Sequence, residues 1–367
     1  THFVFAFYYG MYHYETKSCH LPGNLDIAVG KSPLNLFFNG NTAVRLFLVL
    51  SGYLLCRNYF LDRDRGRLLR SAAGRYLRLM PAVLAVNVVV YLCMKLGLYQ
   101  NVPAAAVAGS EKWFAGFNAF EPSLSGMLRE SLYGCFLFGD NVYNGVVWTL
   151  QMLFVGAYLD YGLAAFVSGL RARWLIYGAL AVLLLRTDFF AVFLGYVLCD
   201  FMHTEWTWRK KLCACAPLNW SLFAAGLYFM CYPSAGFGYE GTIWGILPLV
   251  LVNYYHIFGV LCFVTAVLNL EPLGRFFYMK GFLYLRRISY SLYLIHFPVI
   301  ATFGAWFFLT FYGKFGYNLT CLADLFLTGG ITVALSELSV RLIEPLGRKG
   351  GMLSGSVFAE KGNKKAS

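Results

Sequence analysis

A strongly basic loop between two apolar segments constrains this chain more than any other feature. The apolar segments 43–56 and 79–98 flank a linker with seven arginines, which are Arg57, Arg63, Arg65, Arg67, Arg70, Arg75 and Arg78. Such a linker is typical of a cytoplasmic loop between two membrane spans, because cytoplasmic loops are enriched in Lys and Arg. The loop therefore predicts the orientation of the whole chain.

The composition excludes a soluble globular domain. Hydrophobic residues make up 59% and charged residues 13% of the 367 residues, whereas soluble domains carry about 25% charged residues. Basic residues at the ends of apolar segments explain the net charge of +12, since they orient spans and contact anionic lipid headgroups. We expect a lipid bilayer as partner, no nucleic acid and, because no Cys–His pattern has zinc spacing, no metal site.

Apolar runs near the length of a span predict about ten transmembrane helices. The runs are 1–14, 41–56, 79–98, 142–168, 172–185, 189–202, 217–232, 254–270, 288–311 and 319–343. With the 57–78 loop inside, most Lys and Arg residues fall in cytoplasmic segments and both termini are cytoplasmic. The predicted fold class is an all-α, polytopic membrane bundle, and its short first run indicates a first span truncated at its start.

The remaining segments are predicted to lie outside the membrane. Residues 15–40, 99–141, 233–253 and 312–318 fall on the outer side, and the part from Ser123 to Phe138 has the helical apolar spacing of a surface helix. The transmembrane domain is predicted to span residues 1–349. Residues 350–367 are rich in Gly, Ser and Lys, which predicts a disordered cytoplasmic tail.

Two of the seven arginines share one side of a helix that starts at the cytoplasmic face. In Arg75-Tyr-Leu-Arg78 the charged side chains lie three residues apart and form a fork suited to phosphate or carboxylate. The other interpretation is a pair of anchors that only orient the span. Pro81 follows in the first turns of the span, where it can open backbone carbonyls toward a neighbour or a cavity.

A hydroxyl-rich segment surrounds one histidine of the ninth apolar run. Within Ile288-Ser-Tyr-Ser-Leu-Tyr-Leu-Ile-His296-Phe-Pro298, residues Ser289, Tyr293 and His296 fall at i, i+4 and i+7 and share a helix face. A polar stripe in lipid must face a bundle interior or a cavity. The pattern leaves two interpretations open, an interhelical hydrogen-bond seam and a wall that contacts a ligand.

Six motifs in order resemble those of the acyltransferase-3 family of integral membrane acyltransferases. They are Gly40-Asn-Thr-Ala-Val44 with Phe47-Leu-Val-Leu-Ser51-Gly52-Tyr53, Arg75-Tyr-Leu-Arg78-Leu-Met-Pro81, Trp148-Thr-Leu, Phe193-Leu-Gly195, the segment from Ile288 to Pro298, and Ile343-Glu344-Pro345. The motifs extend over nearly the whole chain.

The resemblance implies transfer of an acyl group, typically acetyl, from cytoplasmic acyl-CoA to a hydroxyl, often on a surface glycan. In such proteins a histidine of the first span is held to be catalytic. His2 resembles it because the chain continues as HFVFAFYYG, whereas His13 would lie at the outer end of the helix. A neutral histidine is suited to accept the proton of an attacking hydroxyl near neutral pH.

The several phosphates of a coenzyme A donor need cationic partners near the cytoplasmic face. We therefore expect donor binding by Arg75 and Arg78, assisted by Arg70 and by Arg286 or Arg287. The pantetheine arm would extend between the spans toward the catalytic histidine. The side chains expected to line that route and contact substrate are Trp148, Gln151, Ser289, Tyr290, Tyr293 and His296.

One departure from the family pattern opens a second hypothesis. Family members usually carry a Glu five residues after the Trp of the fourth span, whereas Leu153 stands here. The alternative is a non-catalytic membrane protein, or a transporter of an acyl or lipid-linked intermediate, on the same scaffold. The basic fork and the lack of an internal repeat favour the enzyme. We expect a multi-pass protein of the plasma membrane; acceptor, acyl length and a homo-oligomeric state stay open.

Overall fold

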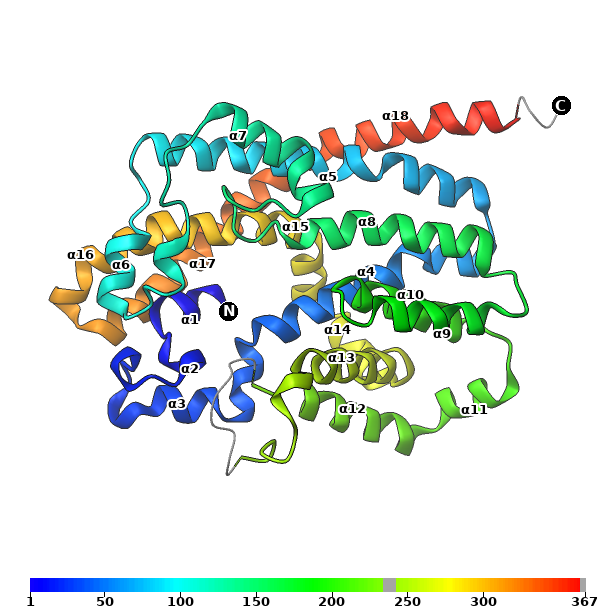
Figure 1. The fold of residues 1–367 in the computed structure, drawn as a ribbon, viewed down its shortest axis with the longest axis horizontal. Helices are drawn as coiled ribbons and strands as arrows, with labels where there is room; N and C mark the ends of the chain where they lie inside the picture. Colours follow the sequence, from blue (N-terminus) through cyan, green and yellow to red (C-terminus); the bar gives the residue numbers. More distant parts are fainter. Residues whose placement is uncertain (234–241, 364–367) are drawn as a thin grey trace.

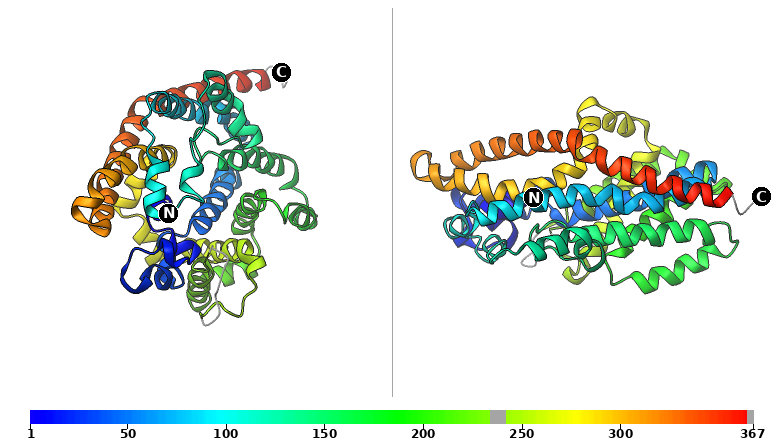
Figure 2. Two further views of the ribbon diagram at one scale, coloured as in Figure 1. Left: turned by 60° about the vertical axis from the view of Figure 1, so that its left-hand side comes forward. Right: turned by 90° about the horizontal axis from the view of Figure 1, so that it is seen from above.

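The computed structural model describes residues 1–233 and 242–363, and this part of the chain is helical without any strand. Most of the long helices run along the longest axis of the molecule (Figure 1). The N-terminus lies among the helices rather than at the rim, in the first view and in the two further views (Figure 2). Of the predicted external segment 233–253, residues 234–241 lie outside the described part.

The helices fall into three groups. The six long ones among the described residues, counted as continuous runs, are α4 (Gly40–Asp62), α5 (Arg65–Lys95), α8 (Thr149–Gly162) continued by the π-helix η6 (Leu163–Val167), α13 (Val252–Asn269), α15 (Lys280–Val299) continued by η8 (Ile300–Gly304) and α16 (Ala305–Phe315), and α17 (Tyr317–Leu342) continued by α18 (Glu344–Asn363). The short ones are α9 (Arg173–Leu184), α10 (Phe189–Met202), α11 (Thr207–Ala214) and α12 (Ala216–Met230). The connecting ones are α1 (His2–Phe7), α2 (Gly10–His13), α3 (Leu25–Gly30), α6 (Asn101–Ala108), α7 (Leu124–Arg129) with the π-helix η5 (Glu130–Phe138), and α14 (Glu271–Phe277). Short 3₁₀ turns connect them at η1 (Thr16–Ser18), η2 (Pro22–Asn24), η3 (Pro33–Phe37), η4 (Phe114–Gly116) and η7 (Leu249–Leu251).

Within residues 1–233 and 242–363, six helices are long and apolar enough to cross a membrane. They coincide with predicted runs two, three, four, eight, nine and ten, and the pair α11 and α12, bent by 70°, makes a seventh if it is one span. The runs 172–185 and 189–202 form α9 and α10, which have 12 and 14 residues. At about 1.5 Å per residue they reach about 20 Å, less than the ~30 Å hydrocarbon core. The first run is divided into α1 and α2 at Tyr8.

Helices α4 and α10 approach each other at two glycines. A Cβ atom on Gly52 would lie 1.9 Å from the carbonyl oxygen of Val192, and one on Gly195 would lie 2.1 Å from the carbonyl oxygen of Val49. Small residues permit such close backbone contacts between spans. Two of the motifs that resemble the acyltransferase-3 pattern thus meet in a packing contact.

The C-terminal segment differs from the sequence prediction. Residues 350–363, expected to be disordered, continue the helix α18 along α5, as Figure 1 and the right panel of Figure 2 show. A Cβ atom on Gly74 would lie 2.6 Å from the carbonyl oxygen of Gly351, so the glycines that suggested disorder permit close packing. The hydroxyl of Ser354 also donates to the carbonyl of Ala73 at 2.8 Å. Residues 364–367 lie outside the described part.

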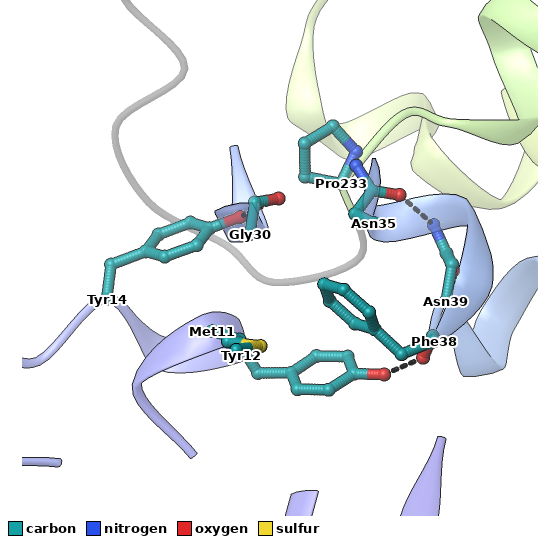
Figure 3. Close-up of a pocket in the computed structure, with 8 residues that line it drawn as sticks. All are labelled: Met11, Tyr12, Tyr14, Gly30, Asn35, Phe38, Asn39 and Pro233. Atoms are coloured by element: carbon teal, nitrogen blue, oxygen red, sulfur yellow. Dashed lines mark hydrogen bonds between the residues drawn. The ribbon is translucent and has the colours of Figure 1, made fainter. Parts of the chain in front are cut away.

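A polar junction anchors the start of α4. The Asn39 side chain caps the helix by accepting from the Thr42 amide at 3.1 Å, and it donates to Asn35 at 3.2 Å. Figure 3 shows this junction beside Tyr12, whose hydroxyl donates to the Phe38 carbonyl. The space between these residues measures about 10 Å³, which is at most the room that one water molecule needs. We infer a structural junction and not a substrate site.

The contact between α4 and α10 predicts a selective effect of added volume. We expect Gly195→Ala to lower stability by about 1–3 kcal/mol, because the new methyl group must separate two backbones. Thermal unfolding of the purified protein in detergent would measure this effect.

Gly178→Ala in α9 is the matched control, since a Cβ atom on Gly178 would have no described neighbour within 4 Å. Equal melting temperatures for the two variants would contradict the packing contact.

Candidate functional site

Two histidines from distant parts of the chain form a hydrogen-bonded pair. Nδ1 of His2, on α1, lies 2.7 Å from Nε2 of His296, on α15. The two rings are nearly parallel, with an interplanar angle of 9° and centroids 4.9 Å apart. Both side chains are half-buried, so each keeps some accessible surface. The structure thus joins the residue predicted to be catalytic to one of the predicted substrate contacts.

The second ring nitrogen of His296 fixes the tautomers of this pair. Nδ1 of His296 lies 2.8 Å from the Tyr293 carbonyl and 3.1 Å from the Leu292 carbonyl. Carbonyl oxygens only accept, so Nδ1 of neutral His296 carries the proton and its Nε2 accepts. His2 must then donate from Nδ1. We assign the free lone pair of His2 to Nε2 from this network of partners.

Aromatic rings enclose the histidine pair. The His2 ring stacks on Trp113 at 5.7 Å and contacts the edge of Phe297 at 5.5 Å, measured between ring centroids. Tyr293, one turn before His296, places its hydroxyl 2.6 Å from the hydroxyl of Thr149. Because Thr149 begins α8, this bond ties the start of α8 to α15. The pair is therefore held in an aromatic setting by three separate chain segments.

Glu130 holds the loop that supports α15. Its buried carboxylate accepts hydrogen bonds from the backbone amides of Val142 (2.6 Å), Tyr143 (2.9 Å) and Asn144 (3.2 Å), and from the Asn87 side chain (3.2 Å). Burial raises the pKa of Glu130, although these donors oppose the shift. The Asn144 side chain in turn donates to the Leu294 carbonyl at 2.9 Å, two residues before His296. A chain of contacts thus runs from Glu130 to the histidine pair.

The two arginines predicted to form a fork, Arg75 and Arg78, lie in different surroundings in the structure. Arg75 is half-buried and its Nη2 donates to the Leu153 carbonyl at 3.1 Å, whereas Arg78 is exposed. Leu153 is the residue that departs from the family pattern, and its backbone carbonyl thus contacts Arg75 of the predicted donor site. Asp160, further along α8, is fully buried within electrostatic range of Arg75. In the described part of the chain, neither carboxylate oxygen of Asp160 makes a hydrogen bond.

The other predicted donor-binding arginines separate into two places. Arg70 and Arg78 line the same cavity, which lies between α5 and α18. Arg287 forms an ion pair with Glu337, and Arg286 is exposed on α15. The structure therefore brings Arg70 together with Arg78, and it places Arg286 and Arg287 outside that cavity.

The remaining predicted substrate contacts are spread over several surroundings. Trp148 packs against the main apolar core. Gln151 donates to the Leu137 carbonyl at 2.9 Å, and Tyr290 donates to the Leu79 carbonyl at 2.9 Å. Ser289 is exposed and donates to the Arg286 carbonyl of its own helix at 3.0 Å. Of the predicted stripe, the structure places Tyr293 and His296 in the enclosed cluster and leaves Ser289 outside it.

Two residues of this region, Glu130 and Asn144, were not predicted from the sequence. Glu130 lies in a segment predicted to be external and Asn144 lies near the start of the fourth apolar run, and an acid or an amide at these places gives no periodic signal. Asp160 had a signal, since it is an ionisable residue within an apolar run. Its proximity to Arg75 depends on how α5 and α8 pack, which the sequence alone does not state.

Comparisons with known proteins identify one domain. The model of a family described as an acyltransferase domain, the acyltransferase-3 family, matches residues 18–337. The match includes the arginine fork and His296, and it begins after His2. No curated protein and no solved structure matches the chain.

The Glu130 contacts predict a stability effect of a nearly isosteric change. In Glu130→Gln one acceptor oxygen becomes an NH₂ group that faces backbone donors, and leaving buried groups unsatisfied costs about 1–3 kcal/mol. We expect the melting temperature of the purified protein to fall accordingly.

Glu121→Gln provides the control, because this exposed acid pairs with Lys95 at the surface. If both variants shift the melting temperature equally, Glu130 does not organise the loop.

Proposed function

Because the chain belongs to the acyltransferase-3 family, we propose that it transfers an acyl group, with acetyl expected, from acyl-CoA to a hydroxyl. One observation carries the chemistry, namely the 2.7 Å contact that leaves Nε2 of His2 as a free base. The family resemblance supports a glycan or another cell-surface molecule as the acceptor. It likewise supports acyl-CoA as the donor, since coenzyme A thioesters are activated carriers of acyl groups.

The proposed reaction uses His2 as general base and then as general acid. Nε2 of His2 accepts the proton of the acceptor hydroxyl while that oxygen attacks the thioester carbonyl carbon. The new C–O bond forms, the C–S bond breaks, and the departing thiolate receives the proton from His2. The products are the acyl ester and free coenzyme A, so atoms and charge balance.

His296 acts in this proposal as a positioning residue. It accepts from Nδ1 of His2, and the Tyr293 and Leu292 carbonyls hold its own proton on Nδ1. When His2 becomes an imidazolium, its bond to His296 becomes charge-assisted and therefore stronger. The arrangement keeps the base in one tautomer, as the buried acid does in hydrolytic triads.

The donor would enter from the end of the bundle where α5 begins. Arg75, Arg78 and Arg70 are the proposed cationic partners of its phosphates, because guanidinium groups bind phosphate in a bidentate manner. Arg75 has a buried Nε atom without a hydrogen-bond partner in the described part of the chain.

The proposed topology follows the basic loop. We place residues 57–78 and the C-terminal helix α18 at the cytoplasmic face of the plasma membrane, in keeping with the bias of Lys and Arg. Thr1 lies among the helices, so the structure does not support the cytoplasmic position expected for the first residue. The six long apolar helices found in the described residues are the core of this arrangement. The ten-span count requires four more crossings, by α1, α9, α10 and the bent pair α11 and α12, with the help of their flanking segments.

Leu153 supports a second candidate, a non-catalytic or transporting protein on the same scaffold. Its side chain is buried in the apolar core, so α8 places no carboxylate beside Arg75 at this position. A Leu153→Glu variant separates the two candidates. Acyl transfer gained only in that variant would indicate a scaffold that had lost its enzyme activity.

The first prediction from this mechanism concerns His2. We expect His2→Ala to lower the rate of thiol release from acetyl-CoA by about 10²–10⁴-fold, because a general base contributes that much. The measurement uses purified protein in lipid nanodiscs, with a thiol reagent that reports free coenzyme A.

His13→Ala is the matched control, since this histidine stacks on Tyr9 and lies away from the pair. Unchanged turnover in His2→Ala, or an equal loss in His13→Ala, would refute the assignment of the base.

The second prediction concerns His296. Loss of the partner that orients the base should lower kcat by about 10- to 100-fold in His296→Ala. The KM for acetyl-CoA should stay close to that of the parent protein, because His296 does not contact the donor phosphates. A change confined to KM would mean that His296 binds substrate and does not position His2.

A further inference from the structure

A basic cavity of about 490 Å³ opens between α5 and the C-terminal helix α18. Among the described residues, four arginines line it, of which Arg67, Arg70 and Arg78 come from α5 and Arg348 comes from α18. The volume falls in the range of small-molecule sites, about 300–1,000 Å³. None of the described side chains that line it is acidic. Its charge therefore favours an anionic ligand.

Close backbone packing fixes Arg348 at the edge of this cavity. A Cβ atom on Gly347 would lie 2.7 Å from the Arg78 carbonyl oxygen, and one on Gly351 would lie 3.1 Å from the Gly74 carbonyl oxygen. These two glycines flank Arg348 on α18. Added volume at either glycine would push α18 away from α5 and move the guanidinium out of the cavity.

The arginines are only weakly neutralised by the protein. Arg70 lies 3.4 Å from Asp64 and Arg348 lies 3.6 Å from Glu344, and in both pairs the arginine is solvent-exposed. Asp64 has another task, because it caps α5 by accepting from the Arg67 amide, and this bond chiefly lowers the pKa of Asp64. Exposed ion pairs contribute little free energy. A phosphate can therefore displace them at low cost.

Arg67 and Arg78 complete the charge of the cavity. Arg67 pairs with Asp62 at 2.5 Å, again at the surface. For Arg78, the described part of the chain provides no ion pair. Four guanidinium groups around one space match a ligand with several phosphates better than a single carboxylate.

We propose that α18 is a functional wall of the proposed donor site, in which Arg348 and Arg67 join Arg70 and Arg78 in binding the nucleotide phosphates of the coenzyme A donor. The inference rests on the proposed acyltransferase function and extends it, because it assigns Arg348 and Arg67 to donor recognition. The phosphates of the donor supply the multiple negative charges that the cavity lacks. Anionic lipid headgroups share this chemistry and are the competing source.

The experiment compares two donors in the full-length protein, reconstituted in phosphatidylcholine nanodiscs. One donor is acetyl-CoA, and the other is the acetyl thioester of N-acetylcysteamine, which lacks the nucleotide. For Arg348→Ala and Arg67→Ala we expect kcat/KM with acetyl-CoA to fall about tenfold, since a charge-assisted hydrogen bond is worth about 1.5–3 kcal/mol. With the truncated thioester the variants should match the parent protein.

Arg275→Ala is the control, because this arginine is exposed on α14 and pairs with Glu271. A second variant, Gly351→Leu, keeps Arg348 but should displace α18 and produce the same selective loss. Equal kcat/KM values for Arg348→Ala and the parent with acetyl-CoA would overturn the proposal. An equal loss with both donors would also overturn it, because the effect would then not depend on the nucleotide.

Two further outcomes distinguish a lipid headgroup from coenzyme A as the ligand, and failure of the donor site from failure of the acyltransferase function. If only added phosphatidylglycerol binds the cavity, and the arginine variants weaken that binding without affecting acetyl-CoA, the site is a lipid site and the proposal fails. If the parent protein releases no thiol from either donor, the acyltransferase function itself fails. A loss of kcat/KM in the variants with acetyl-CoA alone supports both the acyltransferase function and the role of α18 in the donor site.

Discussion

Close backbone contacts between helices determine the geometry of this protein. In lipid, apolar side chains provide little driving force for two helices to associate. Close packing at small residues and interhelical hydrogen bonds must therefore stabilise the contact. Here Gly52 meets Val192 and Gly195 meets Val49, which joins α4 to α10. Gly74 and Gly351 likewise join α5 to α18. These contacts set the positions of the helices that carry the arginines.

Hydrogen bonds complete the arrangement where glycines are absent. Glu130 binds three consecutive backbone amides, and Asn144 in that loop binds the Leu294 carbonyl of α15. The same helix presents His296 to His2. The proposed base therefore depends on the loop before α8 for its position. Such buried, fully used polar groups are costly to disturb, because each lost partner leaves another group unsatisfied.

Much of the fold is predictable from composition and periodicity. Apolar runs identified the six long helices of the described residues, since length and hydropathy alone decide whether a helix can span a bilayer. The runs that form α9 and α10 are equally apolar, but these helices have only 12 and 14 residues. An apolar composition does not determine where a helix begins and ends. Disorder was predicted for residues 350–367, but residues 350–363 are helical. Glycine is common both in flexible segments and at close helix contacts. Composition cannot distinguish a flexible Gly351 from one that packs against Gly74.

The site is partly predictable, for a similar reason. The sequence drew attention to His2 and to His296 separately, since the family resemblance indicated His2 and a polar stripe in the ninth apolar run indicated His296. Their contact joins residues 294 positions apart, and one sequence provides no measure of that distance. The arginine fork was predicted from spacing, yet Arg75 and Arg78 face different surroundings because α8 and α18 pack on different sides of α5. The position of Arg348 in the cavity could not be predicted, because the sequence indicated a disordered tail just after it and no helix packed on α5.

The central claim is that one donor reaches from the arginine cavity to the histidine pair. The most direct test is an electron cryomicroscopy map of the protein with a thioether analogue of acetyl-CoA, which cannot be cleaved. The account predicts density for the nucleotide phosphates beside Arg78 and Arg348, and density for the sulfur and acyl group beside His2. Density for the acyl end at the surface, or at another histidine such as His256, would contradict the account.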